Sequence, residues 1–192
     1  MTMKILAFAG STRSNSLNQK LLDIAALGAI ESGAQVTHIH LGDYPLPFYD
    51  GDLEGKSGLP EKAAALQDLV AESDALLIAS PDYNGGYSAV LKNALDWTGR
   101  PNGDGHSGLA HFANKAAAVV SASPGPLGGS RGQLAIRGVL DKLGMLVIPQ
   151  SFSLGLAHEA FDKTHRLRDA RADAMVRAVG AALAETVRKL KG

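Results

Sequence analysis

Five short apolar runs alternate with stretches of helical periodicity, and this alternation restricts the possible folds more than any other feature of the chain. The apolar runs are of strand length and lie at Ile5–Ala9, Val36–Leu41, Ala75–Ala79, Ala116–Val120 and Met145–Ile148. Continuous apolar runs of this length are typical of parallel strands that are buried on both faces. Helical periodicity is found at Leu17–Ile30, Glu61–Glu72, Val90–Trp97, Gln133–Leu143 and Leu167–Leu190.

This order of elements predicts an α/β fold, a three-layer α/β/α sandwich around a five-stranded parallel sheet. Right-handed crossovers favour the strand order 2-1-3-4-5. The chain has 192 residues, without an internal repeat or a long linker, so we expect one domain over residues 1–192. In an open parallel sheet, ligands bind beyond the carboxyl ends of the strands where the strand order reverses. For this order, the loops after strands one and three form the expected site, with the loop after strand four beside them.

Charge and cysteine content exclude several classes of protein. Lysine and arginine together number 19, as do aspartate and glutamate, and this neutral balance argues against nucleic acid or an anionic membrane as the main partner. The absence of cysteine excludes disulfides, thiolate nucleophiles and zinc–cysteine sites, and it fits a reducing compartment. No run approaches the ~20 apolar residues of a membrane span, and the first residues lack a signal-peptide pattern. We therefore expect a cytoplasmic protein.

A polar loop, Gly10–Asn18, separates the first apolar run from the first helical stretch, and it is rich in serine, threonine and asparagine. The first N–H groups of a helix have no intrahelical partner and carry a partial positive charge. Together with the forked, charged side chain of Arg13, they predict a phosphate-binding loop. The alternative is an ordinary strand-to-helix turn in which Ser16 or Asn15 caps the helix.

The loop after the third apolar run is Ser80–Ser88. Its proline, Pro81, fixes the exit from the strand, and Asn84–Gly86 can adopt positive φ angles that turn main-chain N–H groups outward. With the ring of Tyr83 beside these groups, the loop suits a flat heterocycle whose edge carries donors and acceptors. The alternative is that Asn-Gly-Gly is simply a good turn.

The loop after the fourth apolar run, Ser121–Arg131, consists largely of small residues that allow a ligand to approach the backbone. Ser123 is the natural hydroxyl contact there. The alternative is a flexible turn with no ligand.

These three loops and two further segments match a known family in order and spacing. The matching segments are Gly10–Asn18, Leu46–Asp50, Pro81–Gly85, Leu91–Trp97, Ser123–Gly125 and Gly128–Arg131. Together they resemble the NADPH-dependent FMN reductases, a family of flavodoxin-like proteins that includes quinone, azo-dye and chromate reductases. The resemblance extends from about residue 4 to residue 150.

The resemblance implies a role for individual residues. The FMN phosphate would be held by Ser11, Arg13, Ser16, Asn18 and the backbone amide of Leu17. The isoalloxazine ring would be lined by Pro81, Asp82, Tyr83, Asn84 and Gly85, with Ser123 contacting the flavin from the third loop. Two positions depart from the family pattern. Asp82 stands where glutamate is usual, and Gly86-Tyr87 replaces a commoner pair of one small polar and one apolar residue.

The resemblance also implies the reaction. NADPH or NADH would deliver hydride to bound FMN, and a quinone, azo compound, free flavin or metal oxyanion would then take two electrons in a ping-pong mechanism. The flavin carries the chemistry, so no side chain is expected to be catalytic and no metal is expected. A homodimer or tetramer with the site near a subunit interface is implied. The alternative is an FMN-binding electron carrier or redox sensor that does not itself oxidise NAD(P)H.

Overall fold

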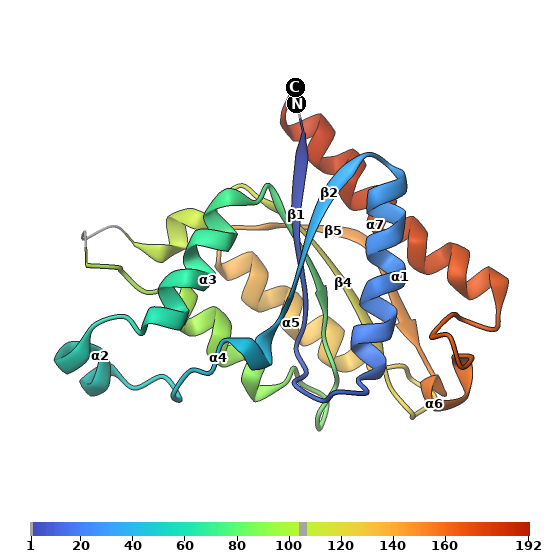
Figure 1. Ribbon diagram of the computed structural model, residues 1–192, viewed down its shortest axis with the longest axis horizontal. Coiled ribbons are helices and arrows are strands. Elements are labelled where there is room, and N and C mark those ends of the chain that lie inside the picture. The colour runs from blue at the N-terminus through green and yellow to red at the C-terminus, as the bar shows by residue number, and fades with distance from the viewer. Residues whose placement is uncertain (1, 104–106) are drawn as a thin grey trace.

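The computed structural model describes residues 2–103 and 107–192, so part of the Gly99–Asn114 connection lies outside the described residues. Five parallel strands form one sheet with the order β2-β1-β3-β4-β5 (Figure 1). The strands are β1 (Met3–Ala9), β2 (Ala34–His40), β3 (Ala75–Ala79), β4 (Ala116–Ala122) and β5 (Leu146–Leu154). The predicted fold class and strand order are therefore confirmed.

Helices cover both faces of this sheet. Helices α1 (Leu17–Glu31) and α7 (Ala170–Leu190) share one hydrophobic core with the sheet. Helices α3 (Glu61–Glu72), α4 (Ala89–Thr98) and α5 (Ser130–Lys142) share the other. Successive residues of a strand point to opposite faces, and β1 accordingly sends Ile5 to the first core and Leu6 to the second.

Close packing of α1 against α7 depends on glycine. A Cβ atom at Gly180 would lie 1.8 Å from the carbonyl oxygen of Ala25, and one at Gly28 would lie 2.0 Å from that of Arg177. The two helix backbones are therefore nearly in contact at these residues. Helix α1 begins directly after the polar loop that follows β1, with Ser16 as its N-cap.

Several element boundaries differ from the prediction. Strand β5 continues to Leu154 rather than ending at Ile148, because a register shift opposite Ala117–Val119 lets its polar half keep pairing with β4. Helix α7 begins at Ala170 rather than Leu167, because Leu167 pairs with Phe161 in a turn and Asp169 caps the helix. The other predicted boundaries differ by three residues or fewer.

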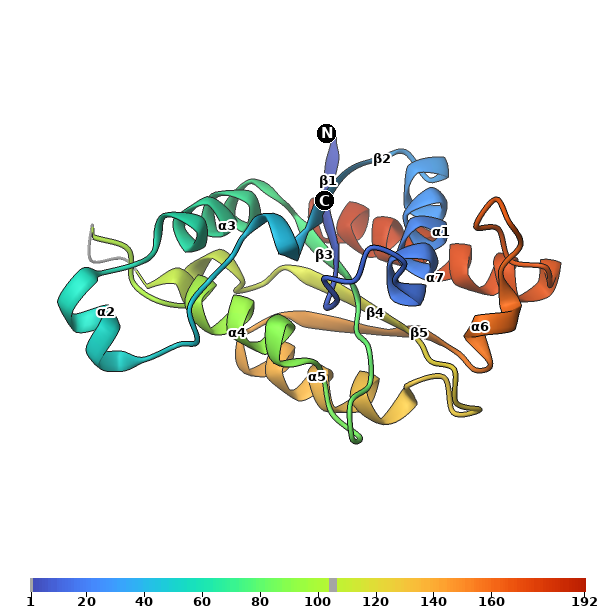
Figure 2. The same ribbon diagram turned by 60° about the horizontal axis from the view of Figure 1, so that its bottom comes forward.

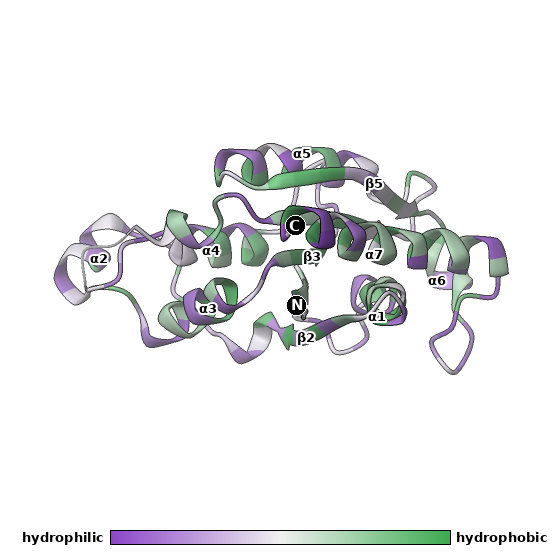
Figure 3. Ribbon diagram, turned by 90° about the horizontal axis from the view of Figure 1, so that it is seen from above, coloured by the Kyte–Doolittle hydropathy of each residue, from purple (hydrophilic) through white to green (hydrophobic). Residues whose placement is uncertain are grey.

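Four short helices were not predicted: η1 (Leu41–Asp43), α2 (Gly51–Ser57), η2 (Gly108–His111) and α6 (Ala157–Ala160). Helix α2 projects away from the sheet and is mostly polar in colour (Figures 1 and 3), so it lacks the apolar stripe by which a helix is recognised. Its N-terminus is capped by Asp50, which accepts hydrogen bonds from the N–H groups of Asp52 and Leu53. No described helix is long and apolar enough to cross a membrane.

Candidate functional site

Three loops meet at the carboxyl edge of the sheet, at the bottom of Figure 1 and turned forward in Figure 2. They are residues 10–16 after β1, residues 80–88 after β3 and residues 123–129 after β4. Ser88, the N-cap of α4, donates its hydroxyl to the carbonyl oxygen of Gly10 at 2.6 Å and so ties the second loop to the first. The meeting of these loops is the arrangement predicted from the strand order.

The loop after β1 is both a capped turn and a potential anion site. Ser16 is the N-cap of α1, and its Oγ accepts a hydrogen bond from the N–H of Gln19 at 3.3 Å. Within the described chain, the N–H groups of Ser14, Asn15 and Leu17 have no hydrogen-bond partner. The exposed guanidinium of Arg13 also makes no ion pair with any described residue. The N-cap and phosphate interpretations are therefore compatible.

Two further residues assigned to the phosphate are buried. Ser11 is buried, and its Oγ accepts a hydrogen bond from the N–H of Arg13 at 3.4 Å. Asn18 is buried, and its Nδ2 donates to the carbonyl oxygen of Ala122 at 2.9 Å while its Oδ1 accepts from the N–H of Ala122 at 3.0 Å. Asn18 thus holds the start of α1 against the end of β4.

The loop after β3 is a tight turn. Tyr83 and Gly86 exchange two backbone hydrogen bonds, of 2.9 and 3.1 Å. The central residues Asn84 and Gly85 have φ angles of 56° and 82°, as the type I′ turn of an Asn-Gly pair requires. Positive φ was expected at Gly86 as well, and that expectation is wrong.

Most N–H groups of this turn are used within the protein, contrary to the expectation that they point outward. The N–H of Tyr83 donates to the carbonyl oxygen of Gly86, and the N–H of Gly86 donates to that of Tyr83. The N–H of Gly85 donates to Oδ1 of Asp82 at 2.8 Å. The N–H of Asn84 is left without a partner among the described residues. Tyr83 is 55% exposed, so much of its side chain is open to solvent.

The loop after β4 presents a hydroxyl rather than an amide. The N–H of Ser123 donates to the carbonyl oxygen of Leu154 at 3.0 Å, and its Oγ accepts from the N–H of Gly125 at 3.2 Å. The backbone amide of Ser123 is therefore used in pairing with β5. The hydroxyl proton of Ser123 has no acceptor among the described residues.

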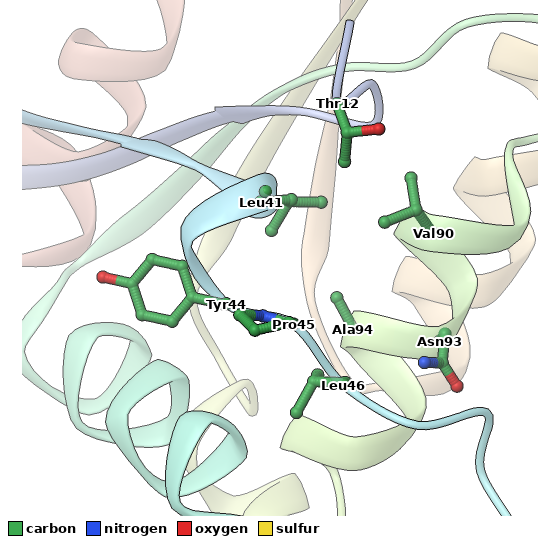
Figure 4. A pocket seen from close by; sticks show the side chains of 9 residues that line it. Thr12, Leu41, Tyr44, Pro45, Leu46, Val90, Asn93 and Ala94 are labelled. Atoms are coloured by element: carbon green, nitrogen blue, oxygen red, sulfur yellow. The ribbon is translucent and has the colours of Figure 1, made fainter.

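A pocket of about 350 Å³ lies beside the first loop and is bordered by none of the predicted site residues (Figure 4). It is lined by Thr12, Leu41, Gly42, Tyr44, Pro45, Leu46, Val90, Asn93 and Ala94. Most of these side chains are apolar. Sequence reasoning missed the pocket because its walls come from three separate segments: the loop after β1, η1 with the residues that follow it, and α4. The signal that points to it is the i, i+4 pair of Val90 and Ala94 on one side of α4.

An extended arm, residues 44–50, forms the outer wall of this pocket and is held against α4. The carbonyl oxygen of Pro47 accepts hydrogen bonds from Trp97 Nε1 and Asn93 Nδ2, each at 2.8 Å. The N–H of Tyr49 donates to Asn93 Oδ1 at 2.8 Å. Within this anchored arm, Phe48 is left 80% exposed.

An ion pair secures the far end of the arm. Arg100 Nε donates to Glu54 Oε1 at 2.8 Å, and this bond lowers the pKa of Glu54 below its ordinary value. Tyr49 donates its hydroxyl to Glu54 Oε2 at 2.9 Å, and the same bond raises the pKa of Tyr49. Among the described residues, no group of three or more histidine, aspartate and glutamate side chains is arranged to hold a metal ion.

Comparison with known proteins identifies the family. Residues 3–159 match the NADPH-dependent FMN reductase family. The chain is 33% identical over 192 residues to an NAD(P)H-dependent FMN reductase of Pseudomonas aeruginosa, with 99% of this chain and 98% of that protein covered. It is 35% identical over 195 residues to an NAD(P)H:quinone oxidoreductase of Solanum tuberosum, with 99% and 95% covered.

A solved structure gives the same result. The fold matches FerB, a flavoenzyme NAD(P)H:(acceptor) oxidoreductase from Paracoccus denitrificans, with a TM-score of 0.81, 28% identity and 98% of both chains covered. The loops described above lie within the matched residues. The chain therefore belongs to the NADPH-dependent FMN reductase family and is an NAD(P)H- and FMN-dependent oxidoreductase.

Proposed function

We propose that this enzyme passes hydride from NAD(P)H, through FMN bound at the three loops, to a small quinone by a ping-pong mechanism. One observation carries the proposal: a polar loop with N–H groups that have no partner among the described residues and a turn with an exposed aromatic ring share one edge of the sheet. Bound FMN supplies the hydride and two-electron chemistry. Azo compounds, free flavin and metal oxyanions are further acceptors under the same proposal.

At the phosphate end, the chain's residues fit a dianion. The N–H groups of Ser14, Asn15 and Leu17 have no partner among the described residues and lie at the positive end of α1, where Arg13 can add a charge-assisted hydrogen bond. We assign phosphate binding to these groups together with the hydroxyls of Ser11 and Ser16. Asn18 supports the phosphate indirectly, by fixing the first turn of α1 to Ala122.

At the ring end, the turn after β3 and Ser123 face the isoalloxazine in our proposal. The N–H of Asn84 and the hydroxyl of Ser123 are hydrogen-bond donors that have no acceptor in the part of the chain that the structure describes. Such donors stabilise negative charge that develops on a ring edge. Pro81, Tyr83 and Gly85 would line the ring, and no side chain is required as a general acid.

Quinones are favoured as acceptors by the named activities of the relatives. A protein of Burkholderia that is 35% identical over 150 residues is a 2-hydroxy-1,4-benzoquinone reductase. A protein of Pseudomonas putida that is 33% identical over 168 residues is a quinone reductase.

We further propose that residues 1–192 form one FMN-binding domain in a cytoplasmic homodimer or tetramer, without a nucleic-acid or membrane partner. The net charge of zero supports the absence of a polyanionic partner. Exposed Phe48, held on an arm that is hydrogen-bonded to α4, supports a subunit contact because rigid exposed aromatic residues are typical interface anchors.

The test mixes the FMN-loaded protein with NADPH without oxygen. We expect the visible absorbance of the flavin to bleach and to return when one equivalent of benzoquinone is added. Steady-state rates at several fixed quinone concentrations should give parallel double-reciprocal lines. Absence of bleaching with both NADPH and NADH would favour an electron carrier or sensor, and intersecting lines would exclude the ping-pong order.

Tyr83→Ala is expected to change acceptor turnover by about three- to tenfold while leaving the unfolding midpoint within the usual range for a surface substitution. The side chain is 55% exposed and its backbone bonds to Gly86 are retained, so folding does not depend on the ring. Steady-state kinetics with two quinones of different size check this, with Leu134→Ala on the outer side of α5 as control. If kcat and KM for both quinones equal the wild-type values, Tyr83 does not border the acceptor.

A further inference from the structure

The carboxylate of Asp82 joins two segments of the proposed flavin site. Its Oδ1 accepts the N–H of Gly85 at 2.8 Å, and its Oδ2 accepts the N–H of Gly132 at 2.8 Å. Gly85 belongs to the tight turn after β3, whereas Gly132 lies in the first turn of α5, 50 residues after Asp82. Both oxygens of this half-buried carboxylate are therefore bonded to backbone amides.

The turn after β3 needs such support. It is a two-residue hairpin closed by the Tyr83–Gly86 pair, and an isolated hairpin is marginally stable in water. Both of its central residues have positive φ, a conformation that costs asparagine more than glycine. Hydrogen bonds to an ionised acceptor are about twice as strong as neutral ones. The bonds to the Asp82 carboxylate are therefore stronger than the neutral backbone bonds between Tyr83 and Gly86.

Helix α5 lies directly against the turn at this point. A Cβ atom at Gly132 would be 2.7 Å from the carbonyl oxygen of Gly86 and 3.0 Å from Cα of Asp82. The glycine thus allows the N-terminus of α5 to come close enough for its amide to reach the carboxylate. The turn, the carboxylate and the helix form one packed unit.

We propose that Asp82 is a positioning residue, which locks the Tyr83–Gly86 turn to α5 and so holds the ring of Tyr83 and the N–H of Asn84 in place for the flavin. This inference rests on the proposed function. In this proposal the Asp82 carboxylate supports the turn and does not contact the isoalloxazine, because each of its oxygens already accepts a backbone N–H. The carboxylate also places a negative charge between the turn and the N-terminus of α5.

The first test needs no flavin. In the apo protein, amide hydrogen exchange at Gly85 and Gly132 should become at least tenfold faster in Asp82→Ala than in wild type. Asp82→Asn keeps one acceptor oxygen but turns an NH₂ group toward the other amide, so only one of the two amides should lose protection. Unchanged exchange at both amides in Asp82→Ala would overturn the proposal. If Asp82→Ala does not fold, Asp82→Asn decides by the same measurement.

The second test asks whether the tie matters for the flavin. Asp82→Ala should raise the dissociation constant for FMN about tenfold. Asp82→Asn removes a negative charge and should favour reduced over oxidised FMN about tenfold, which for a two-electron couple raises the potential by about 30 mV. The matched control is Asp162→Asn, because Asp162 accepts bonds from Thr164 and Arg166 in a turn between α6 and α7.

The outcomes separate this inference from the proposed function. If the FMN affinity and potential of the Asp82 variants match those of Asp162→Asn, Asp82 is only structural and the inference is wrong, while the proposed function stands. If the wild-type protein does not bind FMN at all, both the proposed function and the positioning role are wrong. In that case amide exchange would still report whether the carboxylate holds the turn.

Discussion

Arg13→Ala should weaken FMN binding by about 1.5–3 kcal/mol, the range of a hydrogen bond to a charged group, or roughly 10- to 100-fold in the dissociation constant. The guanidinium is exposed and has no acidic partner among the described residues, so no internal interaction competes with the phosphate. It stands one residue before the free N–H groups that begin at Ser14. Fluorescence titration of the apo protein with FMN measures the effect.

Riboflavin provides the sharpest control, because it has the same ring and no phosphate. Arg13→Ala and wild type should bind riboflavin with equal affinity. The preference for FMN over riboflavin should therefore be roughly 10- to 100-fold lower in Arg13→Ala than in wild type. Arg171→Ala, on the exposed side of α7, should leave both affinities unchanged. An equal loss of riboflavin and FMN affinity would mean that Arg13 does not contact the phosphate.

Asn18→Ala should lower the free energy of unfolding by about 2–4 kcal/mol, because two buried backbone groups of Ala122 lose a partner. The side chain is buried, and it both donates to and accepts from Ala122, 104 residues away along the chain. These two bonds fasten the start of α1 to the end of β4. Urea unfolding of the apo protein measures the change without interference from FMN.

Asn15→Ala is the matched control for this prediction. Asn15 is exposed in the same loop, and its side chain has no partner among the described residues, so its removal should shift the free energy of unfolding by less than about 0.5 kcal/mol. Equal midpoints for Asn18→Ala and wild type would show that the bonds to Ala122 contribute nothing. FMN affinity at low urea should fall less in Asn18→Ala than in Arg13→Ala, because the Asn18 amide is engaged with Ala122.

The fold and the location of the site follow from local patterns in the sequence. A short apolar run such as Ala75–Ala79 is typical of a strand buried on both faces, and the helical stretches between such runs indicate a parallel sheet. Strand order and the carboxyl-edge location of the ligand loops then follow from crossover handedness. The sequence also narrowed the N-cap of α1 to Ser16 or Asn15, because N-capping depends on residues within one turn of a helix, and the structure has Ser16.

What the polar side chains of the site do was decided only by the tertiary structure. Asn18 and Asp82 carry the residue types of ligand contacts, yet they bond to Ala122 and Gly132 on other elements. The arm at residues 44–50 and the pocket beside Thr12 likewise arise where distant segments meet. The hydrophobic periodicity of the sequence predicts which residues are buried. It does not predict which of several buried groups a polar side chain bonds to, because that depends on how the helices pack against the sheet.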